Sequence, residues 1–109
     1  MASTTVNRGN VLYTVVMAVN LTPVATASAT TAEQTFTVPG LIAGDQVSGL
    51  TYNGAWTSQV SIDNFRVVSA NTLGVSFNNG TAGSLTAPSG QYLVEINHPE
   101  SLPLPANAA

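Results

Sequence analysis

The chain has 109 residues, which is the length of one domain, and its five acidic and two basic side chains give a net charge of −3. Only 6% of the residues are charged, against about 25% in an ordinary soluble domain. Two cations cannot neutralise a row of phosphates, so we expect no nucleic-acid partner. The absence of cysteine excludes disulfides, thiolate metal sites and cysteine nucleophiles.

The scarcity of charge also bears on whether the surface of this chain is exposed to solvent or covered by other protein. Soluble monomers are kept apart by net charge and by interspersed Lys and Glu, and Lys commonly protects their edge strands. This chain has no lysine. We therefore expect other protein to cover much of its surface through apolar groups and neutral hydrogen bonds. The alternative is a small neutral module inside an extracellular array.

An apolar run at 11–19 follows Arg8 and precedes the tripeptide 25–27, an arrangement that resembles a signal peptide with its cleavage site. The run is too short for a membrane span, which needs about 20 residues, so we expect no membrane partner. Because the run is rich in valine, we expect a strand over 11–20 in the mature protein. Its continuous apolar character predicts burial on both faces.

The rest of the chain consists of short β-branched and aromatic stretches separated by Gly, Pro, Asn and Ser, as in sandwiches and barrels. No segment has helical periodicity. The expected strands after the first are a weak edge strand at 24–31, then 33–38, about 45–52, the hairpin 59–78, and a last strand through Tyr92, Val94 and Ile96.

The hairpin 59–78 has the clearest pattern, with a tight connection at Ala70-Asn71. Its inward-facing candidates change phase between Ile62 and Phe65, which predicts a β-bulge near Asp63-Asn64. With seven or eight short strands, the sequence predicts an all-β chain. We expect a single β-sandwich, of which the jelly roll is one form.

Both ends of the chain differ from the predicted sandwich, which spans 11–98. Residues 1–10 form a polar leader, and the prolines within 99–109 disfavour both a helix and a central strand. We expect both segments to be extended arms that contact neighbouring subunits. The candidate contact residues in the arms are Arg8, Pro99, Leu102 and Leu104.

Signals for chemistry are weak. His98 is the only histidine, and it stands at a predicted strand end, where a residue is usually solvated. No serine lies in a Gly-x-Ser-x-Gly elbow, and there is no HExxH or EF-hand pattern. We expect no catalysis, metal or cofactor; a calcium site built from loop carbonyls is the remaining alternative. Two matches to the glycosylation sequon, 20–22 and 79–81, are too short a pattern to indicate a site.

Three further side chains have two interpretations each. Tyr52 and Trp56 bracket a predicted turn, where they either stack on a sugar or close a loop over the end of the sandwich; the second is favoured. Arg66 is expected to pair with Asp63 or Glu95 of its own chain, and the alternative is a salt bridge across a subunit contact.

A resemblance to a known family is carried by four stretches of turns and strands. They are Thr31–Leu41, Gly44–Val47, Arg66–Leu73 and Asn79–Leu85. Over about 24–97 the chain resembles the small proteins encoded beside the major capsid protein in tailed-bacteriophage genomes, which act as head decoration or cement proteins. The signatures are structural rather than catalytic, and both arms lie outside the matched region.

The resemblance implies a structural virion protein on the outer surface of the head, over junctions between capsomers. The implied partners are the major capsid protein and further copies of the chain, as a homotrimer in preference to a dimer. Two other classes remain open. One is an adhesion or carbohydrate-binding module that uses Tyr52 and Trp56, and the other is a subunit of the tail or neck.

Overall fold

The structure is a computed structural model that describes residues 9–100, 104 and 106. All regular structure in this part of the chain is β, which confirms the predicted fold class. The strands are β1 (Val11–Leu21), β2 (Ala25–Thr26), β3 (Thr30–Thr37), β4 (Gln46–Tyr52), β5 (Ser61–Ser69), β6 (Thr72–Asn79), β7 (Leu85–Thr86) and β8 (Gly90–Pro99).

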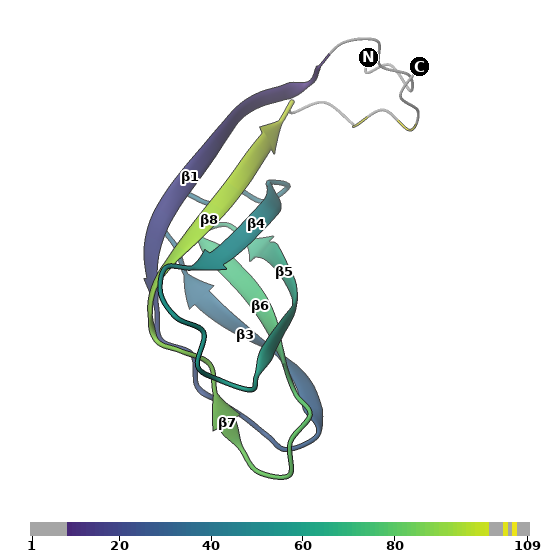
Figure 1. The fold of residues 1–109 in the computed structure, drawn as a ribbon. Helices are drawn as coiled ribbons and strands as arrows, with labels where there is room; N and C mark the ends of the chain where they lie inside the picture. The colour runs from purple at the N-terminus through teal and green to yellow at the C-terminus, as the bar shows by residue number, and fades with distance from the viewer. Residues whose placement is uncertain (1–8, 101–103, 105, 107–109) are drawn as a thin grey trace.

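The strands form two three-stranded antiparallel sheets, in the orders β1-β8-β4 and β3-β6-β5, and a short β2-β7 pair. Figure 1 shows β1 and β8 as a long curved ribbon that continues past the second sheet, while β7 lies at the opposite end of the molecule. This arrangement agrees with the predicted β-sandwich. The jelly-roll form stays a prediction.

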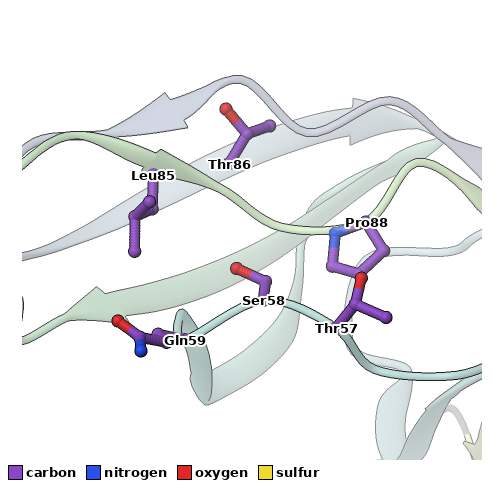
Figure 2. A pocket seen from close by; sticks show the side chains of 6 residues that line it. All are labelled: Thr57, Ser58, Gln59, Leu85, Thr86 and Pro88. Atoms are coloured by element: carbon purple, nitrogen blue, oxygen red, sulfur yellow. The ribbon is translucent and has the colours of Figure 1, made fainter.

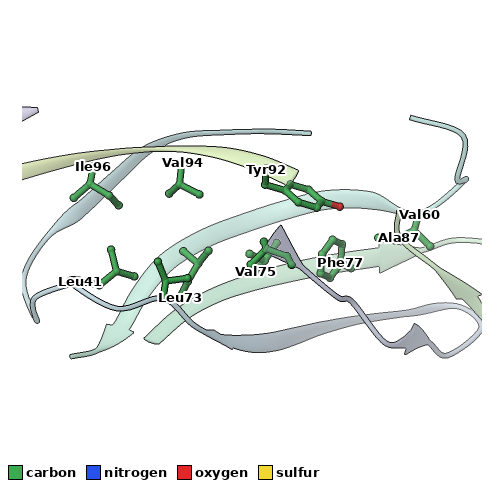
Figure 3. Packing of buried hydrophobic residues seen from close by; sticks show 11 residues of the cluster. Leu41, Val60, Leu73, Val75, Phe77, Ala87, Tyr92, Val94 and Ile96 are labelled. Atoms are coloured by element: carbon green, nitrogen blue, oxygen red, sulfur yellow. The ribbon is translucent and has the colours of Figure 1, made fainter. Parts of the chain in front are cut away.

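The core lies between the two sheets and is built mainly from their central strands, β6 and β8 (Figure 3). Six side chains from these strands are 1% exposed or less, namely Leu73, Val75, Phe77, Tyr92, Val94 and Ile96. They alternate along each strand because successive side chains point to opposite faces of a sheet. Central strands carry the core because they are covered by neighbours on both edges.

The bulge and the tight turn predicted for the hairpin 59–78 are both confirmed. The register of β5 on β6 shifts between Ile62 and Asn64, where the bulge was predicted. The connection at Ala70-Asn71 is tight, and Asn71 adopts a left-handed backbone with φ 58°. Asparagine tolerates this conformation better than most residues, which explains its place in the turn.

The weak strand expected at 24–31 is wrong as a continuous element. Only Ala25–Thr26 form β2, and Thr30 already belongs to β3. A turn separates them: Ala29 has a φ of 53°, and the Thr30 hydroxyl donates a hydrogen bond to the carbonyl of Ala27 at 2.5 Å. A positive φ is incompatible with an extended strand, so the chain changes direction here.

The predicted burial of the first strand on both faces is also wrong for the single chain. Every residue from Val11 to Val16 is exposed, and Leu21, at the other end of β1, is the only buried one in the strand. The reason is topological. The strand is an edge of its sheet, and its first half lies beyond the opposing sheet (Figure 1).

Arg66 pairs with Glu33, and neither of the two predicted partners is correct. Its Nε lies 2.8 Å from Oε2 and its Nη2 lies 2.9 Å from Oε1 of Glu33. The pair crosses the central strand over Gly74, where a Cβ would lie 2.7 Å from Oε2 of Glu33. Glycine thus leaves room for the carboxylate. The hydrogen bonds from Arg66 lower the pKa of Glu33.

Tyr92 is the largest fully buried side chain, and its hydroxyl donates a hydrogen bond to the carbonyl of Pro88 at 2.6 Å. Its ring packs on that of Tyr52, with the centroids 5.0 Å apart. Burial, followed by the neighbouring Tyr52, raises the pKa of Tyr92 to about 12. The folded domain therefore keeps this phenol protonated at a pH where the unfolded chain ionises it.

Stability is expected to fall by about 2–3 kcal/mol between about pH 10 and 12, because the phenol of Tyr92 ionises near 10 when unfolded and near 12 when folded. The contribution is complete below pH 10 and is lost as the pH rises through 12. Urea unfolding across this range measures it. The Tyr92→Phe variant, which lacks the group, should lose less; an equal loss in both proteins would contradict this assignment.

Candidate functional site

The first half of β1 exposes a run of large apolar side chains. The exposed fractions are 50% for Val11, 63% for Leu12, 47% for Tyr13, 38% for Val15 and 59% for Val16. We call these five residues the β1 apolar segment. Scattered apolar side chains are normal on a protein surface, but a contiguous run of this kind marks an interaction site.

The β1 apolar segment presents both faces of the strand. Tyr13 pairs with His98 of β8, and Val15 pairs with Ile96, which is buried in the core. Tyr13 and Val15 therefore lie on the same face of the sheet as the core residues. Val16 alternates with them and lies on the opposite, outer face, while Leu12 stands where the β1–β8 register shifts, between Val11 and Tyr13. A partner at this strand would therefore meet apolar side chains above and below the sheet.

The outer edge of β1 is open as well. In the described part of the chain, β1 pairs only with β8, so its other edge has no strand beside it. No charged residue occurs from Gly9 to Ala32, and the first proline after β1 is Pro23. Proteins normally protect edge strands with charge, proline or a covering element. The strand β1 has neither of the two protecting residue types.

Tyr13 of the β1 apolar segment belongs to a side-chain cluster with His98 and Asp45, which the sequence did not indicate. Nδ1 of His98 lies 2.5 Å from Oδ1 of Asp45, whose side chain is 2% exposed. The other carboxylate oxygen of Asp45 accepts a hydrogen bond from the backbone N–H of Ile42 at 3.3 Å. The Tyr13 ring stacks on the imidazole, with centroids 4.8 Å apart. The cluster fastens the β1–β8 ribbon to the turn at 42–45.

The same cluster offers little for catalysis. Among the described residues, no serine or threonine hydroxyl forms a hydrogen bond with His98, whose contacts are Asp45 and Tyr13. Nor does this part of the chain contain a group of three or more His, Cys, Asp or Glu side chains that could hold a metal ion. What the contacts show is that the pair joins β8 to the turn at 42–45.

Tyr52 and Trp56 do not lie as a flat platform. Their rings meet edge to face at 76°, with centroids 6.0 Å apart. The indole N–H of Trp56 donates to the carbonyl of Val60 at 2.9 Å, and the Tyr52 hydroxyl donates to that of Ser89 at 3.2 Å. Both polar groups bond to the backbone of loops next to the rings, as the loop-closing interpretation expects, and the choice between that interpretation and sugar stacking stays a prediction. Both rings line a shallow groove of about 400 Å³.

A second shallow hollow, of about 420 Å³, lies beside β7 (Figure 2). The residues that line it are Thr57, Ser58, Gln59, Leu85, Thr86 and Pro88. None of them is charged or aromatic, so the hollow lacks the groups that fix an ionic or aromatic ligand.

The predicted arms begin at one place. Val11 pairs with Pro99, and the N–H of Glu100 donates to the carbonyl of Asn10 at 2.8 Å. Asn10 and Glu100, from which the predicted arms would continue, therefore lie together beside the β1 apolar segment. Pro99 itself is the last residue of β8, so the strand continues one residue into the predicted arm.

The candidate contact residues in the arms are only partly described. Leu104 is 59% exposed. Arg8 and Leu102 lie outside the described residues, as does most of both arms, so their expected contacts stay predictions.

No helix in the described residues is long and apolar enough to span a membrane. Comparisons of the chain with protein-family models, with curated proteins and with solved structures gave no match.

Proposed function

We propose that the protein is a structural subunit of a bacteriophage virion, a decoration protein that binds the outer surface of the head and strengthens contacts between capsomers. One observation carries the proposal: the β1 apolar segment lies exposed at the end of the domain where Val11 pairs with Pro99. The choice of a phage head as the partner rests on the resemblance of the turn and strand stretches between Thr31 and Leu85 to head decoration proteins.

The action proposed is mechanical. Burying apolar surface contributes roughly 25 cal/mol per Å², so a small apolar segment gives a modest energy for one subunit. A shell presents many equivalent junctions between capsomers. When one subunit makes several modest contacts at such a junction, the first contact raises the effective concentration for the others, so the overall binding is stronger than any single contact. The partner proposed is the major capsid protein, with no cofactor and no catalytic step. The low charge of the chain suits contacts made of apolar groups and neutral hydrogen bonds.

Electron cryo-microscopy of particles produced from the genome that encodes this chain tests the proposal. We expect density for a small β-sandwich on the outer face of the head, at junctions between capsomers. Density at the tail or neck, inside the shell, or nowhere on the particle would overturn it. Glycan-array binding that is lost in Trp56→Ala would instead support a carbohydrate-binding module.

Truncation of the C-terminal arm tests the contact itself. Removal of residues 101–109 leaves Pro99 and Glu100 in their pairing, so the domain should keep its unfolding temperature. We expect lower occupancy on heads that lack the protein, measured by co-sedimentation. The matched control, Ser101→Ala with Asn107→Ala, keeps both arm leucines and should bind normally. Unchanged binding by the truncated chain would exclude this arm from the contact.

A further inference from the structure

We infer that the open edge of β1 pairs with β1 of a second copy of this chain. The pairing is antiparallel, around a two-fold axis at Thr14, so that two three-stranded sheets become one six-stranded sheet. The inference goes beyond the proposed function and does not depend on it, because the pair forms in solution without a head.

The open edge supplies the hydrogen bonds. The strand β1 is 11 residues long and, among residues 9–100, pairs on one side only. Along such an edge, alternate residues direct their N–H and C=O groups away from the sheet, where they are available to another strand. Seven residues paired antiparallel would supply about six to eight of these bonds.

The position of the axis follows from where β1 is exposed. Every residue from Val11 to Val16 is exposed and Met17 is half-buried, so the accessible stretch is 11–17 and its centre is Thr14. An antiparallel two-fold pairing about Thr14 places Leu12 opposite Val16 of the second copy. It likewise places Tyr13 opposite Val15.

The faces of the strand agree with this register. Opposed residues in an antiparallel pair have their side chains on the same face. Tyr13 and Val15 both lie on the face toward the core and Val16 lies on the outer face, while Leu12 stands where the β1–β8 register shifts, between Val11 and Tyr13. The aromatic and β-branched pair on the inner face and the Thr14 pair at the axis are favourable cross-strand combinations. All five residues of the β1 apolar segment gain neighbours.

The lack of charge favours a second copy as the occupant. No charged side chain occurs from Gly9 to Ala32, so two β1 strands meet without repulsion. A two-fold interface uses the same patch on both chains, and this stretch of β1 complements itself without a second surface. The resemblance favoured a trimer, whereas the exposed edge of this chain favours a dimer.

Sedimentation velocity over about 1 to 300 µM measures the assembly. We expect a monomer–dimer equilibrium for the native chain, and a monomer throughout for Val16→Lys, since the charge would lie against Leu12 of the partner. Val24→Lys is the matched control, because Val24 is 65% exposed and lies outside β1. It should dimerise normally. Circular dichroism and thermal unfolding check that each variant is folded.

The register has its own test in a double variant. Leu12→Lys combined with Val16→Glu places opposite charges across both symmetric pairs, so it should restore the dimer that Val16→Lys abolishes. Restoration requires residue 12 of one chain to face residue 16 of the other. A native monomer at every concentration, a trimer, or a dimer that Val16→Lys leaves intact would overturn the inference.

Cross-linking locates the axis. The chain contains no cysteine, so a single introduced thiol reports one position. Thr14→Cys places two thiols on opposed residues, about 5 Å apart at Cβ, and mild oxidation should give a covalent dimer. Asn20→Cys, on the same face of β1, places its two thiols about 40 Å apart and should stay monomeric on a denaturing gel. Equal cross-linking of both variants would show random collision and overturn the proposed register.

Discussion

Replacement of Asn79 by aspartate is expected to lower the free energy of unfolding by about 3–5 kcal/mol, because it leaves an uncompensated carboxylate in a buried site. Asn79 is 0% exposed. Its amide nitrogen donates to the carbonyls of Thr26 at 2.9 Å and Gly83 at 2.8 Å. Its amide oxygen accepts from the backbone N–H of Thr81 at 3.0 Å and from the Thr81 hydroxyl at 2.7 Å. Aspartate would point an oxygen at two carbonyls.

The neighbouring residue provides a matched control. Asn78 is exposed, and its amide oxygen accepts a hydrogen bond from the Thr31 hydroxyl at 3.1 Å, which a carboxylate can also accept. Asn78→Asp should therefore change stability by no more than about 0.5 kcal/mol. Urea unfolding of both variants at neutral pH makes the comparison. A similar small loss for Asn79→Asp would show that the two hydrogen bonds donated by the Asn79 amide nitrogen contribute little.

Replacement of Phe77 by alanine should cost about 3–5 kcal/mol, the usual loss for a phenylalanine removed from a packed core. Phe77 is 1% exposed on the central strand β6, between Ala32 of β3 and Ile62 of β5 in the register (Figure 3). Both neighbouring strands hold β6 in place, so the backbone has little freedom to close the cavity. The loss should appear in chemical unfolding as a lower midpoint with an unchanged slope.

Phe65→Ala is the comparison for this variant, because it removes the same side chain from the edge strand β5. Phe65 is only half-buried, and we expect a loss below about 2 kcal/mol. Equal losses at the two positions would mean that the core does not depend on the central strands as described.

Local patterns in the sequence were enough to predict the six longer strands, the Ala70-Asn71 turn and the bulge before Asn64, since each depends on alternation or on backbone preference. The same patterns failed for the first strand. An apolar run predicts that a strand needs cover, but it does not reveal whether the cover comes from its own chain. In β1 the residues Val11 to Val16 stay exposed within the described domain.

Contacts between distant positions could not be read from the sequence. Arg66 pairs with Gly74 and Glu33 pairs with Ser76, so their side chains meet diagonally across β6, over Gly74. Asp45 and His98 are 53 positions apart and meet only through the pairing of β4 with β8. Neither the strand order nor the register was available from alternation alone, so the cluster at the base of the β1 apolar segment was missed.

The meeting of Val11 with Pro99 has a practical consequence for labelling. A tag or fluorescent protein fused to either terminus would be joined to the domain through Asn10 or Glu100, which lie together beside the β1 apolar segment. A small dye belongs at the opposite end, beyond β7 in Figure 1. Ala82 is exposed there, between the residues that Asn79 binds, and Ala82→Cys in this thiol-free chain would give one site for conjugation.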